Sequence, residues 1–101
     1  MDIPLINASK VPNSKKKLDN FFFVIETHNK IKVECYKNII KENRIVSGKL
    51  QKVIMGKTAE DVSYSILDNF TDLSNSHYAY LGRELQKAEN ALNENKKYNQ
   101  D

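Results

Sequence analysis

The sequence predicts an α+β fold in which a small antiparallel sheet of about three strands is packed by two C-terminal helices, the last one long. Two observations lead to this prediction. Aromatic, β-branched and alternating residues fill the chain between residues 21 and 55. Two segments with apolar residues at helical spacing follow them, and strands followed by helices are typical of α+β proteins.

The length of 101 residues is that of a single domain. Pro4 and Pro12 break regular structure in the first twenty residues, and the lysine run at residues 15–17 is poor core material. We therefore expect a partly ordered N-terminal arm over residues 1–20 and a single α+β domain over residues 21–101.

The first strand is expected at residues 21–26, FFFVIE, which is apolar on both alternating faces and should be buried on both. A tight turn over residues 27–30 leads into a second strand with strict alternation. Its core-facing positions are Ile31, Val33 and Cys35, and its solvent-facing positions are Lys32, Glu34 and Tyr36. An inward cysteine indicates core packing and not a reactive thiol.

The segment over residues 38–48, NIIKENRIVSG, has two open interpretations. It either extends the hairpin or forms a longer polar excursion. A third strand is expected after it, over residues 49–55, and Gly56 closes that strand.

The two helices are marked by caps and by apolar stripes. Thr58 is an N-cap, and Asp61 three residues later completes a capping-box-like pair. The stripe of this helix, which should end near Asn69, is Val62, Ile66 and Phe70, with Leu67 beside them. A second cap region at residues 73–76 precedes a helix from about His77 to Asn95, whose stripe is Tyr78, Leu81, Leu85, Ala88 and Leu92.

Composition and motifs exclude several classes of function. The single cysteine, Cys35, rules out an internal disulfide, and no residues have metal-ligand spacing. No apolar run reaches the ~20 residues of a membrane span, and the N-terminus is no secretory signal, so we expect a cytoplasmic protein. Gly56-Lys57-Thr58 lacks the earlier glycine of a P-loop, since Gln51 stands there. No base–nucleophile pair can be named, and we expect no enzymatic activity.

The polar side of the long helix is the candidate binding site. His77, Tyr80, Glu84 and Lys87 fall along one side, with Arg83 on the border. These residues either hold a carboxylate or phosphate, or they form a solvated face with Glu84 paired to Lys87. Gly82 in the same helix costs about 1 kcal/mol relative to alanine. Close packing against the sheet and close approach of a ligand are the two explanations for it.

The same helix carries a family resemblance. Residues 77–89, HYAYLGRELQKAE, closely resemble the signature DHAAYLGRELAKAE of the DUF4346 family, and the ending YNQD resembles its closing YVQD. Residues 48–50, GKL, and residues 54–61, IMGKTAED, resemble its GKL and VIRGKSAED segments. The resemblance covers roughly residues 21–101. Ser76 departs from the family's aspartate, which keeps the N-cap but loses a carboxylate.

Members of that family are similar to segments appended to archaeal pterin-binding, dihydropteroate-synthase-like proteins and to relatives of the corrinoid subunit of tetrahydromethanopterin methyltransferase. The resemblance therefore implies pterin- or cobamide-linked one-carbon metabolism in a methanogenic archaeon. We expect a non-catalytic accessory protein without a cofactor of its own. Because the chain stands alone here, it should dock on a separate pterin- or corrinoid-binding methyl-transfer subunit or contact its pterin or cobamide. His77 is then a candidate ligand for the cobalt of a cobamide.

Two other classes of function remain open from the residues alone. The long amphipathic helix, with Tyr78 and Tyr80 on adjoining sides, fits the seam of a homo-oligomer. Much of the net charge of +3 lies in the lysines at residues 15–17, which fit a nucleic-acid binder. We rank that class last, because no recognition helix carries clustered lysine and arginine.

Overall fold

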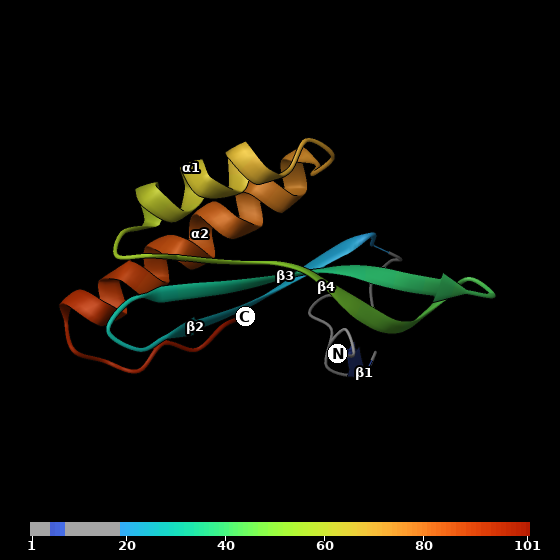
Figure 1. Ribbon diagram of the computed structural model, residues 1–101. Coiled ribbons are helices and arrows are strands. Elements are labelled where there is room, and N and C mark those ends of the chain that lie inside the picture. Colours follow the sequence, from blue (N-terminus) through green and yellow to red (C-terminus); the bar gives the residue numbers. More distant parts are fainter. Residues whose placement is uncertain (1–4, 8–18) are drawn as a thin grey trace. The chain divides into compact units, whose positions relative to one another are not determined.

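The computed structural model describes residues 5–7 and 19–101 (Figure 1). Its elements in chain order are β1 (Leu5–Asn7), β2 (Phe21–Thr27), β3 (Ile31–Lys41), β4 (Arg44–Gly56), α1 (Ala59–Asn69) and α2 (Asn75–Asn93). The sheet has the order β1-β4-β3-β2, so β2 is an edge strand. The α+β fold is confirmed, with three long antiparallel strands and two helices, the last one long.

The N-terminal region adds one short strand to this sheet. Strand β1 pairs antiparallel with β4, and Ile6 lies opposite Gly48. The rest of the expected arm, with the lysine run at residues 15–17, lies outside the described residues. No helix in the described part of the chain is long and apolar enough to cross a membrane.

The chain divides into two compact units. The first unit comprises residues 1–23 and 34–53, and the second unit comprises residues 24–33 and 54–101. The single domain expected over residues 21–101 stays a prediction.

The hairpin of β3 and β4 decides between the two interpretations of residues 38–48. Strand β3 continues to Lys41 and β4 begins at Arg44, so this segment prolongs the second strand of the predicted hairpin and then turns into β4, which starts before the predicted residue 49. Both residues of the connection, Glu42 (φ 52°) and Asn43 (φ 61°), lie in the left-handed region. Positive φ at both central residues is the type I′ geometry that matches the twist of two paired strands. The interpretation as a polar excursion is wrong.

Aromatic residues form the core of the first unit. Its buried apolar residues are Phe21, Phe22, Phe23, Cys35, Tyr36 and Ile45. The rings of Phe22 and Tyr36 are stacked, with centroids 4.7 Å apart and planes 8° from parallel. Tyr36 was predicted to face solvent, and this is wrong because the stack covers it. Burial raises the pKa of the Cys35 thiol to about 12, so the thiol stays protonated at neutral pH, as core packing requires.

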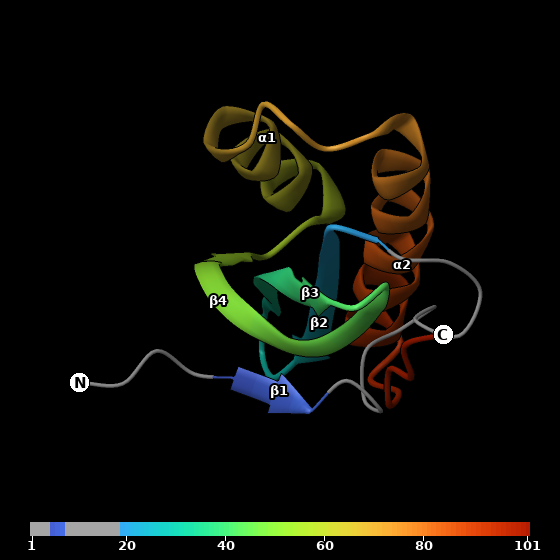
Figure 2. The ribbon, with the colours of Figure 1, turned by 90° about the vertical axis from the view of Figure 1, so that its right-hand side faces the viewer.

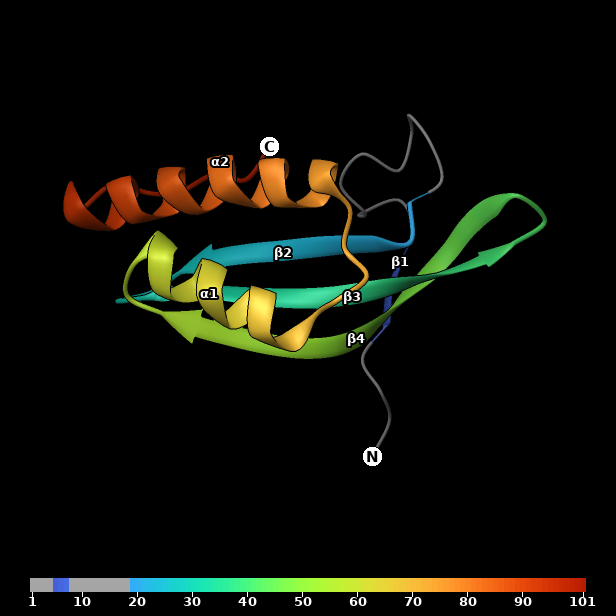
Figure 3. The same cartoon turned by 90° about the horizontal axis from the view of Figure 1, so that it is seen from above.

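In the second unit, α1 and α2 lie on the same side of the strand ends that belong to it (Figures 2 and 3). The buried apolar residues of this unit are Ile25, Ile31, Val33, Ile54, Val62, Ile66, Leu81, Leu85 and Ala88. They confirm Val62 and Ile66 of the first predicted stripe and Leu81, Leu85 and Ala88 of the second. Leu67, placed beside the first stripe, is 50% exposed and does not belong to the core.

Helix caps fix where the two helices start. The Thr58 hydroxyl accepts a hydrogen bond from the Asp61 amide at 3.1 Å, as predicted. The Ala59 amide donates to the Glu89 carboxylate of α2 at 2.6 Å, so α2 satisfies a second orphan donor of α1. Helix α2 begins at Asn75, two residues before the predicted start, because Ser74 is its N-cap.

Candidate functional site

The first predicted site residue, His77, takes part in the cap of its own helix. The Ser74 hydroxyl accepts from the His77 amide at 3.3 Å, and His77 Nδ1 accepts from the Ser74 amide at 2.9 Å. This is a capping box with histidine in the place that glutamate or glutamine usually holds. A histidine in this place gives no sequence signal of a capping box. Because Nδ1 accepts a hydrogen bond within the cap, this nitrogen is not available to a ligand.

Another predicted site residue, Glu84, lies fully buried in the middle of α2, with a relative exposure of 0%. Its carboxylate accepts a hydrogen bond from the Tyr98 hydroxyl at 2.7 Å and one from the Asp101 amide at 3.3 Å. Lys87 Nζ lies 3.2 Å from it and Arg83 Nε 3.3 Å. The predicted Glu84–Lys87 pair is therefore confirmed. The solvated face on which it was placed is wrong, because the end of the chain covers Glu84.

The last residues of the chain are held to α2 and β2 by polar side chains. Gln100 Oε1 accepts from the Ile25 amide of the edge strand β2 at 2.8 Å, and Gln100 Nε2 donates to the Tyr80 hydroxyl at 2.7 Å. That hydroxyl donates to the main-chain oxygen of Asp101 at 2.9 Å. Lys87 Nζ lies 3.0 Å from the Asp101 carboxylate. We call this set the tail network: Tyr80, Arg83, Glu84, Lys87, Tyr98, Gln100 and Asp101.

The tail network unites two separate parts of the sequence. Four of its members belong to the signature of α2, and three belong to the ending YNQD. A side-chain amide of the tail also satisfies a main-chain donor of β2, where an edge strand would otherwise present an unpaired N–H group. The two segments that carry the resemblance thus contact each other through the tail network.

The electrostatics of the tail network favour an ionised Glu84. Burial by itself raises the pKa of this carboxyl group, but the donors Tyr98, Asp101, Lys87 and Arg83 outweigh that effect and hold the pKa below its ordinary value. Burial and the neighbouring Glu84 carboxylate raise the pKa of Tyr98, so its hydroxyl stays a donor. The hydrogen bond from Lys87 lowers the pKa of Asp101.

These shifts predict that acid destabilises the fold through the tail network. The ordinary pKa of Glu84 is near 4.5 and its folded value is lower, so the unfolded chain binds the proton first as the pH falls. The contribution of Glu84 should be complete above this ordinary value and should disappear as the pH falls through the folded pKa. Urea unfolding between pH 7 and pH 3 measures it. Glu84→Gln should give a flatter pH dependence than the wild type, and an unchanged slope would contradict the assignment.

Gly82 lies on the opposite, solvent-exposed side of α2. A Cβ atom built at this position has nothing within 4 Å, so close packing against the sheet is the wrong explanation for this glycine. Exposed, uncharged residues with helical spacing surround it. We call this surface the outer face of α2: Asn75, Ala79, Gly82, Gln86 and Asn90.

Replacing Gly82 by alanine should therefore stabilise the isolated protein. Alanine is favoured over glycine in a helix interior by about 0.8–1 kcal/mol, and no neighbour opposes the added methyl group. Thermal or urea unfolding should show this gain. A loss of stability would mean that the outer face is covered in the isolated protein.

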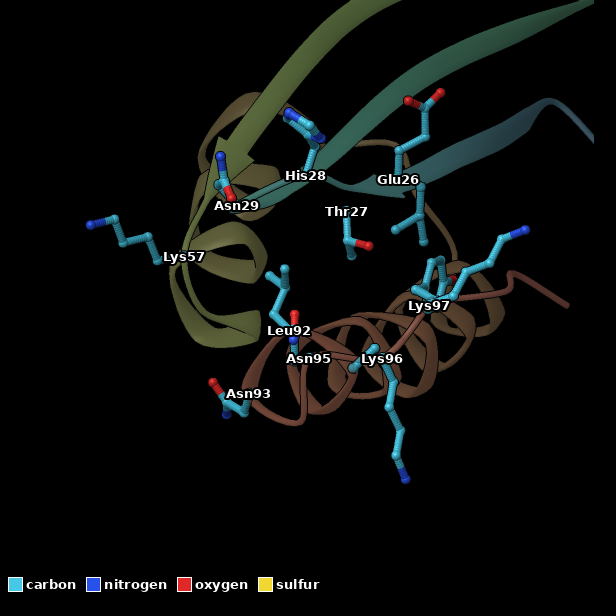
Figure 4. Close-up of a pocket in the computed structure, with 13 residues that line it drawn as sticks. Glu26, Thr27, His28, Asn29, Lys57, Leu92, Asn93, Asn95, Lys96 and Lys97 are labelled. Atoms are coloured by element: carbon cyan, nitrogen blue, oxygen red, sulfur yellow. The ribbon is translucent and has the colours of Figure 1, made fainter.

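The second unit also contains a cleft of about 780 Å³ beside the C-terminal end of α2 (Figure 4). The turn between β2 and β3 forms one wall, and the chain that follows α2 forms another. Lys57, His28, Lys96 and Lys97 give it a basic rim, while Ile25, Ala91 and Leu92 contribute apolar surface. Sequence reasoning missed this cleft because its residues come from three distant segments and form no motif.

No set of three histidine, cysteine, aspartate or glutamate residues that could hold a metal ion is present among residues 5–7 and 19–101. The comparison with family models matches residues 19–101 to the family PterinBD-DUF4346. Comparisons with curated proteins and with solved structures found no match.

Proposed function

This chain belongs to the PterinBD-DUF4346 family, and we propose that it is a non-catalytic, cytoplasmic accessory domain that docks on a pterin-binding methyl-transfer protein. The observation that carries the proposal is the family match over residues 19–101, under a name that couples a pterin-binding domain to this one. We include methyl transfer in the proposal because of the family that the α2 signature resembles.

The arrangement of α2 supports docking through its outer face. Four of the five predicted site residues belong to the tail network, so their polar groups already have partners within the chain. The outer face instead leaves Gly82 open, at a position where glycine weakens the helix. A partner element whose main chain approaches closely at Gly82 offers a physical reason to keep it.

The absence of charge on the outer face fits a docking surface better than a solvated one. Its five members are exposed and carry no charge, in a chain of which 29% of the residues are charged. Removing charged groups from water is costly, and the cores of protein interfaces are depleted of them. A neutral stripe flanked by Arg83 therefore suits a protein partner.

A capture experiment with matched variants tests this proposal. Tagged wild-type protein and a Gly82→Arg variant are used as baits in native extract, with Tyr64→Arg as the control on the exposed surface of α1. We expect the wild type and Tyr64→Arg to retain a protein that mass spectrometry identifies as a pterin-binding methyl-transfer protein. The Gly82→Arg variant should no longer retain this protein, although its free energy of unfolding should be no lower than that of the wild type.

Other outcomes would overturn the proposal. Capture of a corrinoid subunit alone would replace the pterin-binding partner, and there His77 is a candidate ligand for cobalt. A dimer in light scattering that Gly82→Arg dissociates, without any one-carbon protein captured, would make the outer face a homo-oligomer seam. Equal capture by all three baits would remove the outer face from the contact.

A further inference from the structure

We propose that the cleft beside the end of α2 binds a small organic anion with at least two negative charges. This inference is independent of docking, because no member of the outer face lines the cleft. The ligand class follows from the shape of the cleft, from its unpaired cations and from the apolar side chain of Leu92 inside it.

Two asparagines in the left-handed conformation shape the walls. Asn29 (φ 63°) turns the chain between β2 and β3, and Asn95 (φ 55°) ends α2. The Asn95 amide donates to the Leu92 carbonyl at 3.2 Å, and the Lys96 amide donates to the Ala91 carbonyl at 2.8 Å. This pair of bonds is a Schellman motif, which reverses the chain so that the residues after α2 face the hairpin turn.

The cations of the rim differ in whether they already have a partner. Lys96 pairs with Glu94 at 3.0 Å, and the one acidic residue that lines the cleft, Glu26, pairs with Lys32 at 3.7 Å. Lys57 and Lys97 have no ion pair with any residue that the structure describes. The rim of the cleft thus carries two lysines whose positive charge is not neutralised by an acidic side chain, and a bound anion would neutralise it.

The side chains of the cleft are arranged for a ligand with a body and charged ends. Figure 4 shows Thr27 and Leu92 pointing into the cleft, with Lys57 and Lys97 on opposite sides of it and their amino groups directed outward. Lysine carries its charge on a flexible stem and can turn toward a bound anion. A ligand whose body rests on Leu92 would place one anionic group near each lysine.

The end of a helix repels anions, but this effect is weakened here. The carbonyls of Asn90, Ala91 and Leu92 accept main-chain hydrogen bonds from the residues that follow α2. Carbonyls that are paired in this way present less of the negative pole of the helix to the cleft. The two unpaired ammonium groups therefore set the sign of the ligand.

An NMR titration of the full chain with two organic probes, fructose 1,6-bisphosphate and citrate, tests the proposal. We expect amide shifts at Thr27, Leu92 and Tyr98, with the tighter probe showing whether phosphate or carboxylate is preferred. The double variant Lys57→Gln/Lys97→Gln should weaken binding by about ten-fold or more. The control is Lys41→Gln/Lys52→Gln, which removes the same charge from exposed positions of the first unit.

The contradicting results are equally definite. No binding of either probe at millimolar concentration, or equal weakening by the two double variants, would overturn the proposal. Shifts confined to residues outside the cleft would do the same. Each of these results would leave docking through the outer face intact, since that is measured with a protein partner and Gly82 variants.

Discussion

Replacing Glu84 by alanine should lower the free energy of unfolding by about 3 kcal/mol. The substitution removes the acceptor of the Tyr98 hydroxyl and of the Asp101 amide and leaves both without a partner. It also removes the buried carboxylate that the exposed side chains of Lys87 and Arg83 flank. Since Tyr98 and Asp101 belong to the tail, the tail should detach first, and amide exchange should accelerate there before the core of α2 opens.

Urea unfolding at neutral pH measures this loss, and two variants bracket it. Glu60→Ala, at an exposed acid in the first turn of α1, should change stability by less than about 1 kcal/mol. Glu84→Gln keeps an oxygen for the Tyr98 hydroxyl and should fall between the two. If Glu84→Ala costs no more than Glu60→Ala, the tail network does not stabilise the protein.

Gly48→Ala is expected to destabilise the protein by about 3 kcal/mol. A Cβ atom at Gly48 would lie 2.6 Å from Cζ of Phe22 and closer still to Cε1. The ring cannot move away cheaply, because it is 3% exposed and stacked on Tyr36. Protein interiors are close-packed, so the added methyl group must displace the stack or the strand.

The two glycine-to-alanine substitutions form a matched pair in urea unfolding. Gly48→Ala removes stability through a clash, whereas Gly82→Ala adds it through helix propensity. A neutral Gly48→Ala would show that the Phe22 ring is mobile, which would contradict the stacked core of the first unit.

Much of the fold could be predicted because it rests on local patterns. The alternation of Ile31, Val33 and Cys35 and the Thr58 cap each depend on a few neighbouring residues, and both are as predicted. The predicted exposure of Tyr36 was wrong, because the burial of its ring depends on Phe22 in another strand. The turn at residues 42–43 could not be predicted, because it lacks the Asn-Gly or Asp-Gly pair that usually marks a type I′ turn.

The candidate site could be predicted only as a set of residues, without its role. The spacing of Tyr80, Glu84 and Lys87 put them on one side of α2, which is correct. Their partners Tyr98 and Gln100 reach them only after the chain reverses at Asn95, and helical periodicity contains no sign of such a return. Sequence alone therefore showed that this side is polar but not that the tail covers it.

The signature of α2 thus serves two purposes on two sides of one helix. Its polar side attaches the tail, which explains why Glu84 can be charged and buried together. Its outer face stays open at Gly82, and there we place the partner. A ligand site at Glu84 would require the tail to leave and its hydrogen bonds to Glu84 to break.

A double-mutant cycle with Glu84→Ala and Tyr98→Phe, each of which removes the hydrogen bond between the two side chains, tests most directly whether Glu84 serves the tail. The two side chains meet at 2.7 Å, so the free energies of unfolding of the two single variants should not add. We predict a coupling energy of about 1–2 kcal/mol. Additivity within about 0.3 kcal/mol would show that the two groups do not interact, and it would return Glu84 to the residues available for a ligand.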